Sequence, residues 1–545
     1  MRADLKNANV LVAAVVGSLI LLNLIALKTF WRVDVTRDHA YTLSQGTKET
    51  LEKLEDPVTI TAYFTGQLPA PYSGNARYVR DLLTEYRSAS KGKLSFEFID
   101  PSQEETEDDK ATKNEIKRDI FGRAYREPTS VEKELASLGV APVEIRVVED
   151  DQMQTKRAYM GLVIRHQEKK EVIPVVQNVA TLEYDLTSLI RKLTRPKMPV
   201  IGIVQGHGEP ALDEKLRTLQ ASLSEMYEVR PIDLSSKEKV DDDVDALWII
   251  GPKTAFKTNE LKAVDQFLMK GKSAAFFLDS VQVDTRTFQP TETQHGLSDL
   301  LSTWGITVSD KLVADARSGH LNVQERRGFM VVSMPVPYPF IALLQKLEGD
   351  SPVSQGLTGI TFPFATQVSA TPGDGRTVTV LARSSEKSWL ESRPYNIDPR
   401  RDWRSETIVP TGPYDLMVQV SGKLKSHFAA EANTSSASGT PVLAESTGDA
   451  RIIVAGGSSF LWDDFASPPN QALALNVADW LLLDPSLLAM RTRGFNDALI
   501  KPDLSDATRN AAKFGNALGV PVLLAAVGVF RWRMRERRRK TAANV

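Results

Sequence analysis

The pattern of hydrophobic and polar positions divides this chain of 545 residues into two apolar ends and a long, mostly polar body. Uncharged apolar runs cover residues 10–27 and 514–530. Each is about as long as the 17–25 residues that a helix needs to span the roughly 30 Å hydrocarbon core of a bilayer. The pattern therefore predicts two transmembrane helices.

Basic residues flank both apolar runs and predict an orientation. Arg2 and Lys6 precede the first run, and a strongly basic tail, residues 531–545, follows the second. Because basic residues stay on the cytoplasmic side, we expect both termini in the cytoplasm and the body outside it. A cleaved signal peptide is the alternative for the first run. Leu27-Lys28-Thr29-Phe30 is too bulky for a cleavage site, which favours an uncleaved anchor.

The first part of the body, residues 57–196, combines predicted strands and helices in a thioredoxin-like order. The chain has no cysteine, so the C-x-x-C redox motif of that fold is missing and we expect a scaffold. A strand–helix–strand unit comes first and a hairpin follows. The expected elements are strand 58–64, helix 75–90, strand 94–98, a helix ending at Gly139, strands 143–148 and 159–164, and helix 184–194.

The second part, residues 197–495, alternates short apolar strands with amphipathic helices. This alternation predicts a doubly wound, parallel Rossmann-like sheet. Residues 310–440 interrupt it and are expected to form a partly β insertion. The expected strands are 200–204, 246–250, 274–278 and 451–455, and the expected helices are 212–226, 259–270 and 470–483.

These segments together give the predicted domain organisation. It consists of a cytoplasmic N-terminus (1–9), a transmembrane helix (10–27), a juxtamembrane connector (28–56), the thioredoxin-like α/β domain (57–196), the Rossmann-like α/β domain (197–495), a connector (496–513), a second transmembrane helix (514–530) and a basic cytoplasmic tail (531–545).

Composition and charge exclude several classes of function. The net charge of −2 argues against nucleic-acid binding, and the basic tail fits anionic membrane lipid better than DNA. Gly271-Lys272-Ser273 imitates the end of a phosphate-binding P-loop, but the motif requires glycine where Gln266 stands. It must also follow a strand, and here it follows a predicted helix. The chain therefore offers no ATPase site of this kind.

A candidate binding crevice comprises His207, Glu209, Asp279 and Ser458. Each residue follows a predicted strand, and ligands of open α/β sheets bind beyond the carboxyl ends of strands. The alternative is a glycine-permitted turn in which His207 and Glu209 hold the loop by hydrogen bonds. Neither the nucleophile-elbow motif nor a metal-ligand spacing is present, so we predict no catalytic residue, metal or cofactor.

Short motifs along most of the chain carry a family resemblance. They lie in a fixed order between the two apolar runs, and each is weak alone. They are Arg32-x-Asp34-x-Thr36, Tyr41-Thr42-Leu43-Ser44, Tyr184-Asp185-Leu186-Thr187-Ser188, Gly206-His207-Gly208-Glu209, Phe277-Leu278-Asp279 and the segment 451–460. In these motifs the chain resembles the GldG-like accessory proteins of ABC transporters, known from gliding motility.

The resemblance implies an extracytoplasmic body whose Rossmann-like domain is similar to glutamine amidotransferases but does not work as one. It also implies a multispan permease and a separate cytoplasmic ATPase as partners. We therefore predict a non-catalytic accessory subunit in the bacterial inner membrane, with a periplasmic body that binds substrate or an envelope partner. The alternatives are a membrane-anchored periplasmic hydrolase or carbohydrate-active enzyme, and a mechanical scaffold of envelope machinery.

Overall fold

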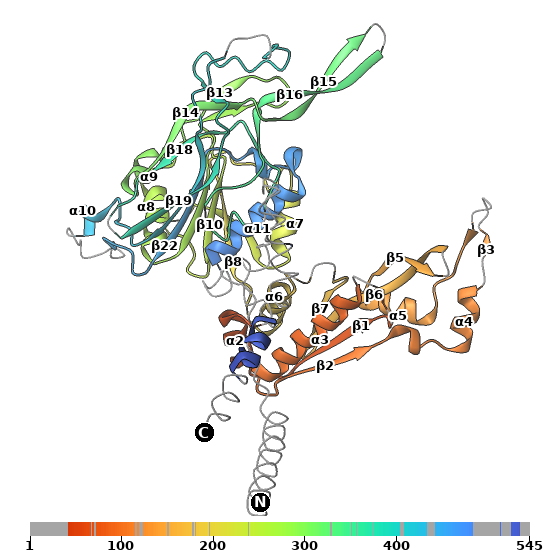
Figure 1. The fold of residues 1–545 in the computed structure, drawn as a ribbon. Coiled ribbons are helices and arrows are strands. Elements are labelled where there is room, and N and C mark those ends of the chain that lie inside the picture. The colour runs from red at the N-terminus through yellow and green to blue at the C-terminus, as the bar shows by residue number, and fades with distance from the viewer. Residues whose placement is uncertain are drawn as a thin grey trace, which may run out of the picture. The chain divides into compact units, whose positions relative to one another are not determined.

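The computed structural model describes residues 42–482, with short gaps between residues 67 and 441, and separately residues 513 and 525–534. Residues 1–495 and 496–545 are two separate units. The described part is a mixed α/β protein with parallel and mixed sheets (Figure 1).

The first sheet lies in the N-terminal part and has the strand order β2-β1-β6-β5, with β7 paired to β6. β1 and β2 are parallel, whereas β1 and β6 are antiparallel. Helices α2, α3 and α6 bury leucines in the same hydrophobic core as the strands. The bounds are α2 (Gln45–Glu52), β1 (Val58–Phe64), α3 (Tyr72–Ala89), β2 (Leu94–Ile99), α5 (Ser130–Leu138), β5 (Pro142–Glu149), β6 (Gln152–His166), β7 (Lys169–Ile173) and α6 (Leu182–Thr194).

The second sheet has seven strands in the order β19-β21-β22-β11-β10-β8-β9. The five strands from β22 to β9 are parallel, and β21 and β19 extend the sheet in antiparallel pairing. The bounds are β8 (Val200–Gln205), β9 (Glu228–Asp233), β10 (Ala246–Ile250), β11 (Ser273–Phe277), β19 (Arg376–Arg383), β21 (Asp415–Gly422) and β22 (Ala450–Ala455).

The central strands β8, β10, β11 and β22 of the second sheet are buried on both faces, which explains their nearly uninterrupted apolar sequences. Side chains alternate along a strand, so in β10 Trp248 faces one hydrophobic cluster while Leu247 and Ile249 face the other. Helices α7 (Arg217–Ser224) and α11 (Pro468–Leu482) pack into the first cluster, and α8 (Thr258–Met269) packs into the second. The loops that hold the predicted crevice residues follow the carboxyl ends of the parallel strands.

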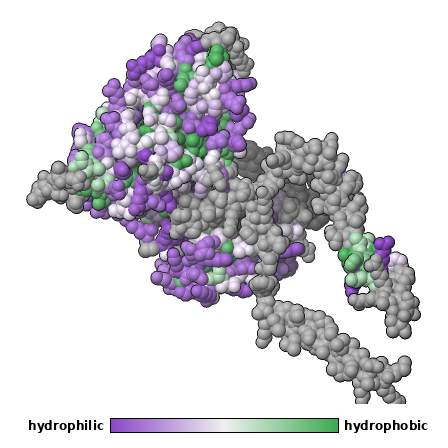
Figure 2. Space-filling view, turned by 60° about the vertical axis from the view of Figure 1, so that its left-hand side comes forward, coloured by the Kyte–Doolittle hydropathy of each residue, from purple (hydrophilic) through white to green (hydrophobic). Residues whose placement is uncertain are grey.

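The segment between β11 and β22 contains further small sheets besides β19 and β21. One has the order β18-β14-β20 and another the order β15-β16-β17. The surface seen in Figure 2 is largely hydrophilic over the described residues, with scattered hydrophobic patches. The bounds are β12 (Val281–Val283), β13 (Pro290–Glu292), α9 (Ser298–Thr303), β14 (Ile306–Asp315), β15 (Ser318–Arg327), β16 (Met330–Leu344), β17 (Ile360–Pro363), β18 (Thr366–Ala370), β20 (Ser388–Glu391) and α10 (Ala429–Ala432).

The prediction of two transmembrane helices is corrected by the structure. Across the described residues, no helix combines the length and the apolar character needed to cross a bilayer. Residues 10–27 lie outside the described residues, as do residues 514–524 of the second predicted span. The predicted inner-membrane location with a periplasmic body depended on those two spans and is corrected with them.

Candidate functional site

The four residues of the predicted crevice all follow strands of the second sheet, and all are buried. His207 and Glu209 lie in the loop after β8, Asp279 lies two residues after β11, and Ser458 lies three residues after β22. Their hydrogen bonds divide them into two groups. One group is centred on His207 and the other joins Asp279 to Ser458.

The imidazole of His207 is held between two carboxylates and an aromatic ring. Its Nδ1 lies 3.3 Å from Oε1 of Glu209, and its Nε2 lies 3.1 Å from Oε2 of Glu260. The ring stacks on Phe256, with 3.7 Å between the ring centroids. The backbone amide of His207 also donates to Oε2 of Glu209 at 2.6 Å. Both ring nitrogens are therefore engaged within the protein.

The two carboxylates beside His207 differ in their electrostatics. Burial raises the pKa of Glu209 above its usual value, although hydrogen bonds from its own and the His207 backbone oppose the shift. Burial would also raise the pKa of Glu260, but the hydrogen bonds from the Lys257 backbone and from His207 outweigh it and leave this pKa lowered. The Lys257 amide donates to Oε2 of Glu260 at 2.6 Å, where α8 begins. Glu260 thus joins the helix start to the loop after β8.

Sequence reasoning missed Glu260 and Phe256 as neighbours of His207. A signal for Glu260 was present, because an acidic residue in the first turn of a helix reaches back to the amides at its start. The spacing between residues 207 and 260 gives no such signal for the contact itself. It depends on β8 and β10 lying side by side in the sheet.

Asp279 and Ser458 form the second group. Oδ1 of Asp279 accepts from the Ser458 amide at 2.7 Å, and Oδ2 accepts from the Ser458 hydroxyl at 2.5 Å. Burial raises the pKa of Asp279, and the two hydrogen bonds from Ser458 only partly oppose it. These bonds tie together the carboxyl ends of the neighbouring strands β11 and β22.

The arrangement of the four residues favours hydrogen-bonded supports over reaction chemistry. A hydrolytic triad would require the Ser458 hydroxyl to face the His207 imidazole, but that hydroxyl donates to Asp279 and His207 faces two glutamates. No group of three metal-ligating side chains suited to an ion occurs among the described residues. A binding role for the four residues stays a prediction.

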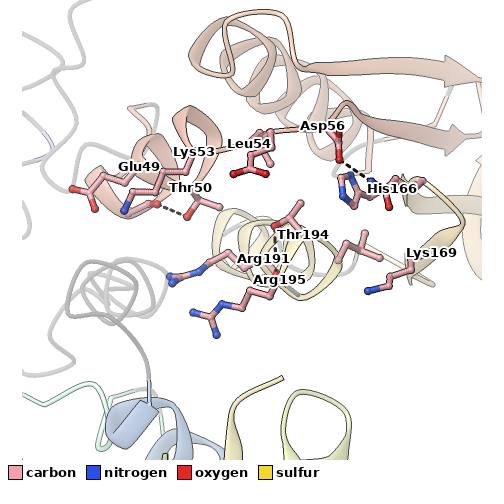
Figure 3. A pocket seen from close by; sticks show the side chains of 14 residues that line it. Glu49, Thr50, Lys53, Leu54, Asp56, His166, Lys169, Arg191, Thr194 and Arg195 are labelled. Carbon is pink, nitrogen blue, oxygen red and sulfur yellow. Dashed lines mark hydrogen bonds between the residues drawn. The ribbon is translucent and has the colours of Figure 1, made fainter. Parts of the chain in front are cut away.

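The structure contains a polar pocket that sequence reasoning did not single out. It has a volume of about 440 Å³ and lies between α2, the turn joining β6 to β7, and the end of α6. Figure 3 shows Lys53, Arg191 and Arg195 extending toward one side of it, whereas His166 and Lys169 lie toward the other. Glu49, Glu55 and Asp56 add negative charge, so the lining carries both signs.

His166 gives this pocket a defined hydrogen-bonding group. Its Nδ1 lies 3.3 Å from the Pro57 carbonyl oxygen, which can only accept, so Nδ1 carries the proton of this hydrogen bond. In the neutral ring Nε2 is then left as an acceptor. The side chain is buried and lines the pocket, so its position is fixed.

Comparison with known proteins assigns this mixed α/β chain to a class of transport proteins. The family model described as an ABC-type uncharacterized transport system matches residues 198–484, just over half of the chain. The chain belongs to this family. A second model, a domain of unknown function, matches residues 37–165. The predicted relation to ABC transporter accessory proteins is thereby confirmed at the level of the family.

Similar proteins add little about function. An uncharacterized protein of Borreliella burgdorferi is 24% identical over 529 residues, covering 92% of this chain and 93% of the relative. The mmIFT52 N-terminal domain is 12% identical, with 52% of this chain and 98% of that chain covered and a TM-score of 0.33. The exo-beta-1,4-mannosidase Op5Man5 from Opitutaceae bacterium strain TAV5 is 9% identical, with 55% and 39% covered and a TM-score of 0.23. At such TM-scores neither structural likeness carries an argument.

Proposed function

We propose that this chain is a non-catalytic accessory subunit of a bacterial ABC transporter, working beside a multispan permease and a separate ATPase. The observation that carries the proposal is the family match across residues 198–484, which includes the whole second sheet.

The surroundings of Lys272 support the need for a separate ATPase. Gly271 has φ +77° and ends α8, and Lys272 follows it before β11 begins. The Lys272 ammonium donates to Asp245 at 3.0 Å. This helix-to-strand order is the reverse of a P-loop, in which the glycine-rich turn precedes a helix. The energy for transport would therefore come from another chain.

The first experiment is purification of the tagged full chain from its native host in a mild detergent, followed by mass spectrometry. The proposal expects a permease and an ATPase in stoichiometric amounts, and a strain expressing the tag alone serves as the control. Recovery of the folded chain without either partner would overturn the transporter role.

The polar pocket shown in Figure 3 supports a finer proposal, that this subunit binds a small charged substrate. Its volume of about 440 Å³ lies in the range of small-molecule sites. Within the described residues, neither Lys53 nor Arg195 forms an ion pair, so both are available to a ligand. Basic side chains of this kind bind carboxylate and phosphate groups.

The pocket is tested by identifying the small molecules released when the purified complex is denatured. The double variant Lys53→Ala, Arg195→Ala should lose a charged compound that the wild-type complex carries. The matched control is Lys110→Ala, Lys113→Ala, which removes two exposed cations elsewhere on the chain. An identical set of compounds in all three preparations would contradict the binding role while leaving the accessory role intact.

A further inference from the structure

The strands β15 and β16 form a long ribbon that extends from the second half of the chain (Figure 1). β16 lies between β15 and β17 in a three-stranded sheet, so β15 is an edge strand. Edge strands expose unpaired backbone groups, and proteins usually block them against the addition of further strands. The two long edges of this ribbon differ in whether they are blocked.

Prolines block the outer edge of β16. Pro335 pairs with Asn322 and Pro337 pairs with His320 across the antiparallel ladder. Proline has no amide hydrogen, so these must be pairs that exchange no hydrogen bond, in which the backbone groups point away from the partner strand. At Pro335 and Pro337 the outer edge of β16 therefore lacks two successive amide donors, and it cannot support a regular added strand there.

The same pairing leaves the outer edge of β15 open. His320 and Asn322 belong to the pairs that exchange no hydrogen bond, so their amides and carbonyls point outward, away from β16. Both residues are exposed, and both can donate because neither is proline. Among the described strands β16 alone pairs with β15, so this edge is free to accept another strand.

We propose that a second copy of this chain binds here, by antiparallel pairing of β15 with β15 around a two-fold axis at Asn322. Each copy has one open edge and one blocked edge. Two-fold pairing uses both open edges and leaves the blocked edges outside, so assembly stops at a dimer. A head-to-tail addition would need an open edge on each side of the ribbon and is excluded by the prolines.

The side chains of β15 fit this register. With Asn322 on the axis, Leu321 lies opposite Val323 of the second copy, and Val323 lies opposite Leu321 of the second copy. Both side chains are only partly buried in one chain, so pairing would cover more of their apolar surface. His320 and Asn322 lie on the opposite face, where polar side chains remain in water.

The first test uses proline to remove the outward amides. The full chain carrying His320→Pro and Asn322→Pro should fold normally, because Pro335 and Pro337 already occupy the partner positions of the same pairs. We expect the wild type to form a dimer. The dimer dissociation constant of the variant should be at least about 100-fold higher, because four amide donors are lost per dimer. The matched control, His320→Ala with Asn322→Ala, keeps the amides and should dimerise. Sedimentation velocity over a range of concentrations measures this.

A second pair of variants tests the register without proline. Leu321→Glu with Val323→Glu places like charges opposite each other and should dissociate the dimer, whereas Leu321→Lys with Val323→Glu pairs opposite charges and should restore it. A wild-type chain that stays monomeric, or a proline variant that dimerises like the alanine control, would overturn the proposal. A purified complex in which the edge of β15 is occupied only by another subunit would also overturn it.

Discussion

Asp279 holds Ser458 by two hydrogen bonds, from the backbone amide at 2.7 Å and from the hydroxyl at 2.5 Å. The two residues stand at the carboxyl ends of adjacent strands, where α/β proteins commonly place their ligands. In this chain the carboxylate instead satisfies an amide that would otherwise be buried without a partner. The contact therefore acts as a support for the loops above the sheet, and its removal should lower the free energy of unfolding.

We expect Asp279→Leu to lower the free energy of unfolding by roughly 2–4 kcal/mol, because it leaves the Ser458 amide and hydroxyl buried without a partner. Asp279→Asn should have a much smaller effect. Its amide oxygen can accept from the Ser458 backbone, its NH2 group can donate to the hydroxyl, and the cost of burying a charge disappears. Urea denaturation at pH 7 measures both. Equal losses in the two variants would contradict the hydrogen-bonding role.

Gly251 lies next to the contact between Asp279 and Ser458 and gives an independent test. Its φ is +57°, and a Cβ at this position would lie 2.6 Å from the Ser458 hydroxyl oxygen and 2.9 Å from Oδ2 of Asp279. Gly251→Ala therefore combines backbone strain with a clash, and we expect a loss of roughly 2–4 kcal/mol. Gly448→Ala is the matched control, because a Cβ there meets nothing within 4 Å. Thermal unfolding of both variants should separate them clearly, and similar melting temperatures would contradict the packing argument.

Variants of His207 can distinguish a structural support from a binding site. We expect His207→Ala to lower the free energy of unfolding by roughly 2–3 kcal/mol, because Glu209 and Glu260 lose a buried partner and Phe256 loses its stacked ring. Recovery of the transporter partners in a pull-down below the melting temperature should remain unchanged. The same holds for the double variant His207→Ala, Glu209→Ala. A folded variant that has lost its activity in the complex would instead identify a binding crevice.

Four of the five parallel strands of the second sheet could be predicted from the sequence because they are buried on both faces, whereas the edge strand β9 is mostly not buried and was missed. Strands at 200–204, 246–250, 274–278 and 451–455 are confirmed to within one residue at each end. The two strands that extend this sheet, β19 and β21, come from the stretch predicted only as a partly β insertion. Their place beside β22 depends on pairing between distant residues, which no local pattern encodes.

Helix boundaries show the same limit. The helix predicted at 212–226 is confined to Arg217–Ser224, and its first turn is held by Asp463, which accepts from the Thr218 amide at 2.9 Å. A cap from a residue far along the chain leaves no local signal.

The hairpin predicted from 143–148 and 159–164 is only partly right, because β6 pairs with β5 over Gln152–Tyr159 and with β1 over Met160–His166. At the two ends of the chain, the local pattern instead predicted too much. Hydropathy alone predicted two membrane spans, and no described helix provides one.

His295 supplies a prediction about pH. It is buried, its Nδ1 accepts from the Leu297 amide at 3.1 Å, and burial lowers its pKa to about 4 from an ordinary value of 6.5. The unfolded chain therefore takes up a proton on this residue before the folded chain does. Its contribution to stability is fully present above pH 6.5, decreases as the pH falls from 6.5 to about 4, and is flat below that.

The loss attributable to His295 amounts to about 3 kcal/mol, from 1.36 kcal/mol for each unit of pKa difference. The variant His295→Asn keeps an acceptor near the Leu297 amide but has no titrating group. We expect the wild type to lose up to about 3 kcal/mol relative to this variant between pH 7 and pH 4. Urea denaturation of both proteins at half-unit pH intervals measures the difference, in which the titration of shared carboxylates cancels. A difference that stays constant over this range would mean that His295 is protonated in the folded protein as readily as in the unfolded chain.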